Sequence, residues 1–117
     1  MKLIIDKPLT SLNEYINAER GNKYKAAAIK KTETEYCRIC AKNQLKPVTS
    51  YPVDVLVKWY TTDRKDHDNI SFGFKFIGDG LVNAGIIEND GPKQIRNISH
   101  EFVKSKKEWC EVWLLEI

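Results

Sequence analysis

Alternating apolar and polar positions predict the strands of this chain. Every second side chain from Val53 to Trp59 is apolar and faces one way, a period of two that is typical of a strand with one buried face. A shorter strand is expected over residues 2–5, and two more over residues 93–103 and 109–117. One face of the last strand carries Trp109, Trp113, Leu115 and Ile117. We expect the tryptophans to pack in the core or in a dimer interface rather than to stack on bases.

Helical spacing accounts for most of the remaining chain. Residues 24–44 are rich in alanine and carry spaced apolar residues, which predicts one long helix closed by Pro47, and Ser11 suits the N-cap of a first helical turn. The expected order is strand, helix, strand, helix and two further strands. We therefore predict an α+β fold, with a single compact domain over residues 1–117, one small mixed sheet and helices packed against it.

The helix expected between the second and third strands has apolar residues at spacings of three and four, which are Ile70, Phe74, Ile77, Leu81 and Ala84. It would take its N-cap from Asp68 or Asn69 and stop at Gly85. Three glycines inside it are expected either to weaken the helix or to let another backbone approach closely. They are Gly73, Gly78 and Gly80.

Acidic residues gather around this helix. If the chain is still extended before it, Asp66 and Asp68 share one face while His67 is a spacer turned to the other. Lys75 follows about two turns later on the same side, and Asp90 lies in a turn. Carboxylates suit Mg²⁺, which would polarise a phosphodiester while the lysine stabilises its charge. The alternative is a set of solvated loop charges.

Basic residues also cluster, although 19 basic and 16 acidic residues leave a net charge of only +3. The total charge therefore says little about partners, and the distribution matters more. Candidate contacts to DNA phosphates are Arg20, Lys23, Lys25, Lys30 and Lys31, with Arg64 and Lys65 directly before the acidic pair. The alternative for each group is an ordinary solvated surface.

The cysteines and the hydropathy of the chain bear on two further possibilities, a zinc site and a membrane span. Cys37 and Cys40 form a lone C-x-x-C, so a zinc site would have to recruit Cys110 and His100 from distant strands, and we favour buried thiols instead. We also expect His100 to be structural rather than catalytic. No apolar run approaches the ~20 residues that span a bilayer, and the first residues do not form a signal peptide. We expect a soluble intracellular protein with no small organic cofactor.

The acidic segment resembles the RusA family of Holliday junction resolvases, especially phage and prophage members from Gram-positive bacteria. The matching residues are Asp66-His67-Asp68-Asn69-Ile70, Lys75 to Leu81, Ala84-Gly85 and Asn89-Asp90, with Leu12 to Ala18, Arg20, Asn22, Tyr24, Ala27 and Lys30-Lys31 near the N-terminus. Together they cover most of the chain.

This resemblance implies a Mg²⁺-dependent homodimeric endonuclease in the bacterial cytoplasm that makes paired nicks across a four-way DNA junction. By motif position its essential residues would be Asp66, Asp68, Lys75 and Asp90, with the three aspartates as metal ligands. Asp79 matches a further recurrent position. Three rivals stay open: a non-catalytic module that binds branched or single-stranded DNA, a metal-dependent nucleotide phosphohydrolase, and a purely structural dimer.

Overall fold

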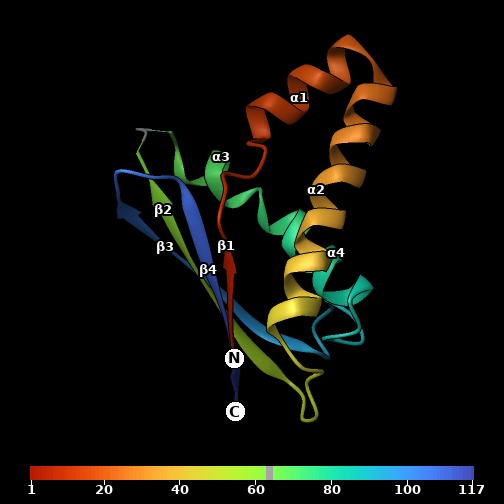
Figure 1. Ribbon diagram of the computed structural model, residues 1–117, viewed down its shortest axis with the longest axis vertical. Coiled ribbons are helices and arrows are strands. Elements are labelled where there is room, and N and C mark those ends of the chain that lie inside the picture. The colour runs from red at the N-terminus through yellow and green to blue at the C-terminus, as the bar shows by residue number, and fades with distance from the viewer. Residues whose placement is uncertain (63–64) are drawn as a thin grey trace.

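A mixed four-stranded sheet carries helices on one of its faces in the computed structural model, which describes residues 1–62 and 65–117 (Figure 1). The elements in chain order are β1 (Lys2–Ile5), α1 (Leu12–Gly21), α2 (Lys23–Gln44), β2 (Val53–Thr61), α3 (His67–Ser71), α4 (Phe74–Asn83), β3 (Ile95–Lys104) and β4 (Trp109–Glu116). The predicted α+β fold with one mixed sheet is confirmed. None of these helices is long and apolar enough to cross a membrane.

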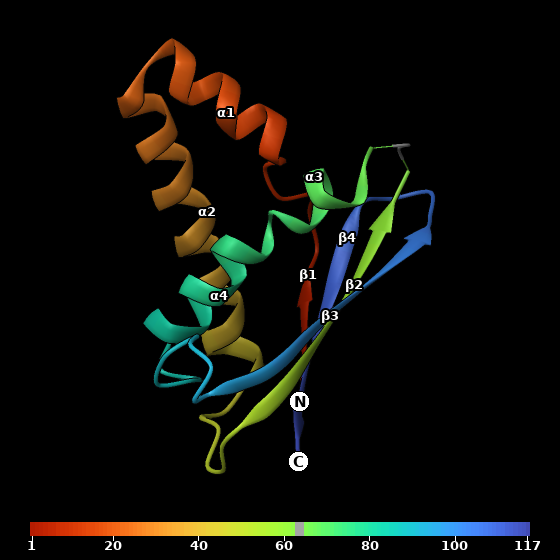
Figure 2. The ribbon, with the colours of Figure 1, turned by 180° about the vertical axis from the view of Figure 1, so that it is seen from behind.

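The sheet has the strand order β1-β4-β2-β3, so β2 lies between the two strands that follow it in the sequence. β2 runs parallel to β3 and antiparallel to β4, and β1 runs antiparallel to β4. The link from β3 to β4 crosses the end of β2, where the Ser105 amide donates to the Thr61 carbonyl at 2.9 Å. α3 and α4 form the crossover between the parallel strands β2 and β3 (Figure 2).

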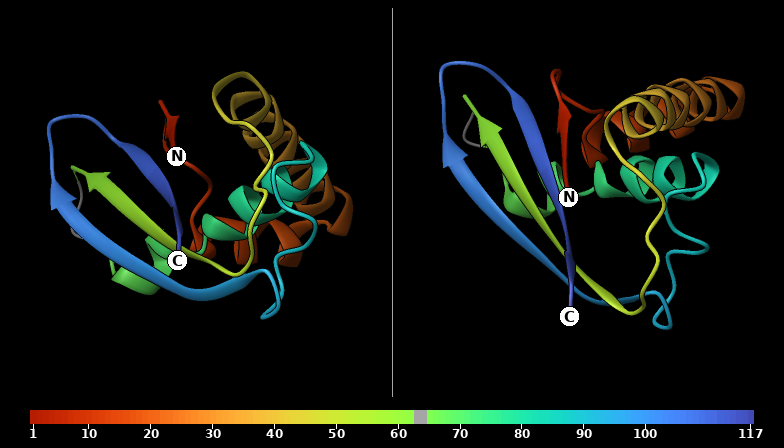
Figure 3. Two further views of the ribbon diagram at one scale, coloured as in Figure 1. Left: turned by 90° about the horizontal axis from the view of Figure 1, so that it is seen from below. Right: turned by 60° about the horizontal axis from the view of Figure 1, so that its bottom comes forward.

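The helix-covered face of the sheet forms the core, and the opposite face has no helix on it (Figure 3). Val53, Val55, Val57 and Trp59 are buried on the covered face, as their alternation predicts. In β4 the buried residues are Cys110, Val112 and Leu114. Because neighbouring side chains of a strand point to opposite faces, Trp109 and Trp113 lie on the uncovered face. They therefore do not pack in the helix-covered core, and their packing in a dimer interface stays a prediction.

The contact between α2 and α4 depends on Gly80. A Cβ at this position would lie 2.6 Å from the Cβ of Cys37 and 2.9 Å from the backbone nitrogen of Arg38. Only a residue without a Cβ lets the two helices approach this closely, which confirms one of the two roles expected for the helix glycines. The neighbouring residues Phe76, Ile77 and Leu81 are fully buried beneath it.

The single helix expected after β2 is instead divided into α3 and α4. Its N-cap is Asp66 rather than Asp68 or Asn69, and α3 begins at His67. The break falls at Gly73, where a Cβ would lie 3.0 Å from the Trp59 ring and 3.1 Å from the Leu9 Cβ. The turn thus follows from a long-range contact that the local pattern does not contain. The expected stop at Gly85 is confirmed by its positive φ of 74°.

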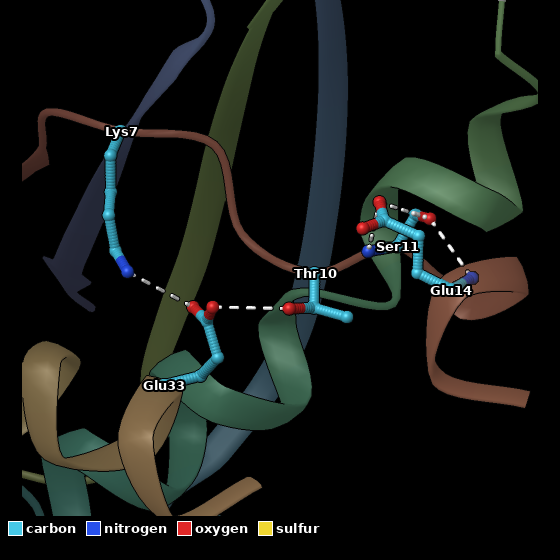
Figure 4. A network of polar contacts seen from close by, with 5 residues as sticks. All are labelled: Lys7, Thr10, Ser11, Glu14 and Glu33. Atoms are coloured by element: carbon cyan, nitrogen blue, oxygen red, sulfur yellow. Dashed lines mark hydrogen bonds and ion pairs between the residues drawn. The ribbon is translucent and has the colours of Figure 1, made fainter. Parts of the chain in front are cut away.

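The segment between β1 and α1 is fixed to α2 by polar contacts (Figure 4). Lys7 lies 3.6 Å from a carboxylate oxygen of Glu33, and the Thr10 hydroxyl donates to the other oxygen at 3.1 Å. The Lys7 ammonium also lies over the Tyr36 ring at 4.4 Å. The predicted N-cap at Ser11 is confirmed, with a reciprocal capping box to Glu14. These contacts fix the start of α1 relative to the middle of α2.

Candidate functional site

Asp66 and Asp68 lie where β2 passes into α3, and both are exposed. We call these two residues the acidic corner. Asp66 occupies the N-cap position, but its side chain makes no capping hydrogen bond. Asp68 is in the first turn and accepts a hydrogen bond from the Asn69 amide at 3.0 Å. Since α3 already includes residue 68, the two carboxylates do not share a face of extended chain, and that part of the prediction is wrong.

Asn69 attaches this corner to α1. Its side-chain oxygen accepts a hydrogen bond from the Asn13 backbone amide at 2.9 Å. Asn13 is in the first turn of α1, where amides have no partner within the helix, so Asn69 satisfies one of them from another helix. The Tyr15 and Phe72 rings pack beside this bond, with centroids 5.3 Å apart. The sequence predicts Asn69 as a possible N-cap and as part of the family motif, but it does not predict this long-range contact.

Lys75 and Asp90 both lie along α4. Lys75 is exposed in the first turn of the helix. Asp90 folds back from the following loop onto α4, because a Cβ at Gly78 would lie 3.2 Å from its carboxylate oxygen. Gly78 is three residues after Lys75, and residues three apart are neighbours on a helix surface. The structure therefore places Asp90 against α4 about one helical turn after Lys75.

Asp79 faces another neighbour. With Asn83 it lines a groove between α4 and α2, and the α2 side of that groove carries Lys30 and Lys31. The arrangement places two of the predicted DNA-binding lysines opposite an aspartate whose role the motif left undefined.

The carboxylates do not form a ready-made metal site in one chain. Across residues 1–62 and 65–117, no group of three or more His, Cys, Asp or Glu side chains is arranged to hold a metal ion. The predicted trio of Asp66, Asp68 and Asp90 is thus not assembled. The donor chemistry of Asp66 and Asp68 still fits Mg²⁺, which takes oxygen ligands, keeps several waters and commonly uses one or two carboxylates.

Three aspartates of this segment differ from Asp54 on β2 in their ion pairs. Within the described part of the chain, no ion pair involves Asp66, Asp68 or Asp90. Asp54 on β2 is different, since Arg96 donates to both of its carboxylate oxygens, at 3.1 and 2.7 Å. Those hydrogen bonds hold the pKa of Asp54 below its usual range. Asp66, Asp68 and Asp90 therefore differ from Asp54, because no described basic side chain neutralises their carboxylates.

Aromatic rings separate the acidic corner from the covered face of β3. The His67 ring stacks on Phe102 with centroids 3.8 Å apart, so it packs on a strand rather than serving as an extended spacer. Two residues before Phe102 and on the same face of the strand, Nδ1 of His100 accepts a hydrogen bond from the Trp59 indole at 2.9 Å. Phe74 meets His100 edge to face. Partial burial lowers the pKa of His100.

Five of the seven predicted DNA-binding residues lie on α1 and α2, which form a helical hairpin that projects beyond the sheet (Figures 1 and 2). Arg20, Lys23 and Lys25 are exposed around its tip at Asn22. Lys30 and Lys31 follow along α2. Lys65 is exposed beside Asp66, at the acidic corner. Arg64 lies outside the described residues. Tyr24, 72% exposed at the tip, is an additional candidate that charge patterning could not single out.

The cysteines are free thiols. Burial raises the pKa of Cys37 to about 12, and burial also raises the pKa of Cys110. Neither thiol is therefore a thiolate near neutral pH, as nucleophilic chemistry would need. Among the residues that the structure describes, they do not join His100 in a metal-binding group.

Comparison with known proteins does not identify a relative. No family model matches the chain, and no curated protein matches it.

Proposed function

We propose that the protein is a Mg²⁺-dependent endodeoxyribonuclease that acts as a homodimer on four-way DNA junctions. The observation that carries this proposal is the acidic corner, where Asp66 and Asp68 are exposed at the end of β2 and form no ion pair with another described residue. These two residues begin the segment that resembles the RusA family. A protein of this type would work in the cytoplasm of a bacterium, encoded by a phage or prophage.

In this proposal Asp66 and Asp68 hold the metal ion, and Asp90 approaches from the loop beside α4. When bound, Mg²⁺ would polarise the scissile phosphodiester and lower the pKa of the attacking water. Lys75 stabilises the negative charge that develops on the phosphate. The residues of the helical hairpin, from Arg20 to Lys31, bind the phosphates of a neighbouring DNA arm.

A homodimer supplies what one chain lacks. A single acidic corner can cut one strand, whereas paired nicks need two corners related by symmetry. A two-fold dimer would present both to a junction of matching symmetry. Binding of Mg²⁺ and DNA together would bring the corner and Asp90 into one site.

One observation favours a second candidate, a module that binds branched DNA without cutting it. The described residues of one chain do not assemble a three-carboxylate group. A binding module needs the basic hairpin but not this group. Against it, exposed aspartates beside a DNA-binding surface repel phosphates unless a cation lies between them.

A cleavage assay tests the proposal. Purified protein is incubated with a labelled four-way junction and with a linear duplex of the same sequence, with and without Mg²⁺. We expect symmetric nicks in the junction alone, only with Mg²⁺, and loss of at least about a hundredfold in rate for Asp68→Asn. Glu116→Gln, an exposed change on β4 away from the corner, is the matched control and should cut like the wild type.

Other outcomes would redirect the assignment. Full activity of a folded Asp68→Asn protein would refute the role of the corner. Tight junction binding without cutting, across several metals and sequences, would favour the binding module. Turnover of free nucleotides without regard to junction structure would indicate a phosphohydrolase.

A further inference from the structure

The two edge strands of the sheet, β1 and β3, differ in how their outward backbone groups are covered. At the β1 edge the side-chain amide of Gln44 bonds the Ile4 backbone twice: its oxygen accepts from the Ile4 amide at 2.8 Å, and its nitrogen donates to the Ile4 carbonyl at 2.9 Å. One side chain of α2 thus takes the place of a neighbouring strand. Such covering is a common way to keep an edge from pairing with another chain.

The β3 edge has no comparable cover. In the described part of the chain β2 is the only strand paired with β3, and β3 runs along the open side of the sheet in both ribbon views (Figures 1 and 2). Alternate residues of an edge strand direct their backbone N–H and C=O groups outward, so β3 offers a row of them. Between Asn97 and Val103 it contains no proline and one charged residue, Glu101. Ile98 and Val103 are exposed on it.

The uncovered face of the sheet is a weaker candidate for an interface. Its aromatic residues already have polar partners within the chain, since Glu111 accepts hydrogen bonds from both the Tyr60 hydroxyl and the Trp113 indole. The Lys2 ammonium lies over the Trp113 ring. Among the described residues, no side chain bonds to the outward backbone groups of the β3 edge in this way, and a second strand would satisfy them.

We propose that the β3 edge pairs antiparallel with β3 of a second copy of this chain, joining the two sheets across a two-fold axis at Ser99. This inference rests on the homodimer in the proposed function and assigns its interface. The occupant is a second copy because the edge is self-complementary in this arrangement.

Register and charge select the axis. Residues that oppose one another across an antiparallel pair share a face, so a symmetric axis must pass through a residue. With Ser99 on the axis, Ile98 faces the second copy's His100 and Asn97 faces the second copy's Glu101, with no like charges opposed. An axis at His100 would oppose Arg96 and Lys104, and an axis at Glu101 would oppose two glutamates. An axis at Ile98 would shorten the paired stretch.

The arrangement also affects the acidic corner. Antiparallel pairing sets the Phe102 end of one β3, on which His67 stacks, beside the Ile95 end of the other. The loop that carries Asp90 leads into that second end. Each acidic corner of the dimer would therefore lie at the same end of the joined strands as the Asp90 loop of the other copy.

Sedimentation analysis of purified full-length protein tests the interface without reference to DNA cutting. We expect a monomer–dimer equilibrium whose Kd rises about fivefold or more in Ser99→Lys, because two lysines then meet on the axis. Leu115→Lys places the same charge on the exposed, uncovered face of β4 and should leave the Kd within about twofold. At Asn97 the two signs should act oppositely: Asn97→Lys tightens the dimer against Glu101, and Asn97→Glu loosens it.

Three outcomes would overturn the interface. They are a protein that stays monomeric up to about 1 mM, a dimer weakened by Leu115→Lys but not by Ser99→Lys, and equal effects of both charges at Asn97. Circular dichroism of each variant confirms folding, since all three positions are exposed. A dimer with this interface that fails to cut junctions would refute the proposed function alone, and a junction nuclease that dimerises through Leu115 would refute the interface alone.

Discussion

Two helix contacts anchor the segment between β2 and β3, and they differ in kind. α4 is packed against α2 in the interior, where Gly80 allows backbone contact and Phe76, Ile77 and Leu81 are fully buried. α3 is attached to α1 near the surface, through the hydrogen bond from Asn13 to Asn69 and a half-buried pair of aromatic rings. No residue of α3 is buried.

The difference shows where the chain can adjust. Interior packing tolerates little movement, because each buried contact depends on close fit. A surface contact that depends on one hydrogen bond can open at a small cost in free energy, because water replaces the lost partner. Asp66 and Asp68 lie on the loosely attached end, and Lys75 and Asp90 lie by the firmly packed helix. Closing the acidic corner around a cation would therefore move α3 rather than α4.

The largest expected effect is at the interior contact. Gly80→Ala would place a Cβ 2.6 Å from that of Cys37, forcing the helices apart and lowering the free energy of unfolding by about 2–3 kcal/mol. Gly21→Ala is the matched control, because nothing lies within 4 Å of its Cβ. It should stabilise the protein by about 0.5 kcal/mol. Urea denaturation measures both, and equal stability of the two variants would show that α2 and α4 are not in close contact.

The surface contact should matter less. Asn69→Ala removes the acceptor of the Asn13 amide and should cost about 1 kcal/mol in urea denaturation. Hydrogen exchange should rise in the first turn of α1 and in α3, while α4 keeps its protection. Asn83→Ala, an exposed change on α4, is the control and should not reduce stability. A loss above about 3 kcal/mol would mean that the two anchors are equally firm.

Local patterns were enough for elements whose conformation follows from their own residues. The alternation of β2, the long helix α2, the N-cap at Ser11 and the stop at Gly85 are all as predicted. The break at Gly73 was not predictable, because it follows from contacts with Trp59 and Leu9 far away in the sequence. Without that break, the apolar spacing of Ile70 and Phe74 resembles one continuous helix.

The topology of the sheet was needed to tell which face of a strand is buried and which elements lie side by side. β4 has apolar residues on both faces, so alternation alone could not show that Cys110, Val112 and Leu114 are buried while Trp109 and Trp113 are not. The arrangement of the candidate site also depends on contacts between elements far apart in the sequence. The resemblance predicts Asp66, Asp68, Lys75 and Asp90 as site residues, but their relative positions depend on how α3 begins and how the Asp90 loop folds back on α4.

The smallest expected effect concerns the rings between the two anchors. Burial lowers the pKa of His100 in the folded protein, so the unfolded chain binds more protons at mildly acidic pH. The stabilising contribution of neutral His100 is therefore complete above its ordinary pKa of about 6.5 and is lost as the pH falls through that value towards the lower folded pKa. Protonation of Nδ1 would also remove the acceptor of the Trp59 indole.

Urea denaturation between about pH 5 and pH 8 measures this contribution. His100→Gln keeps an oxygen acceptor for Trp59 but cannot titrate, so its stability should fall less steeply than that of the wild type on the acidic side. The chain has only one other histidine, His67, which is exposed and stacked on Phe102. If the stability of His100→Gln fell as steeply as that of the wild type on the acidic side, burial of His100 would not be the source of the acid sensitivity of the fold.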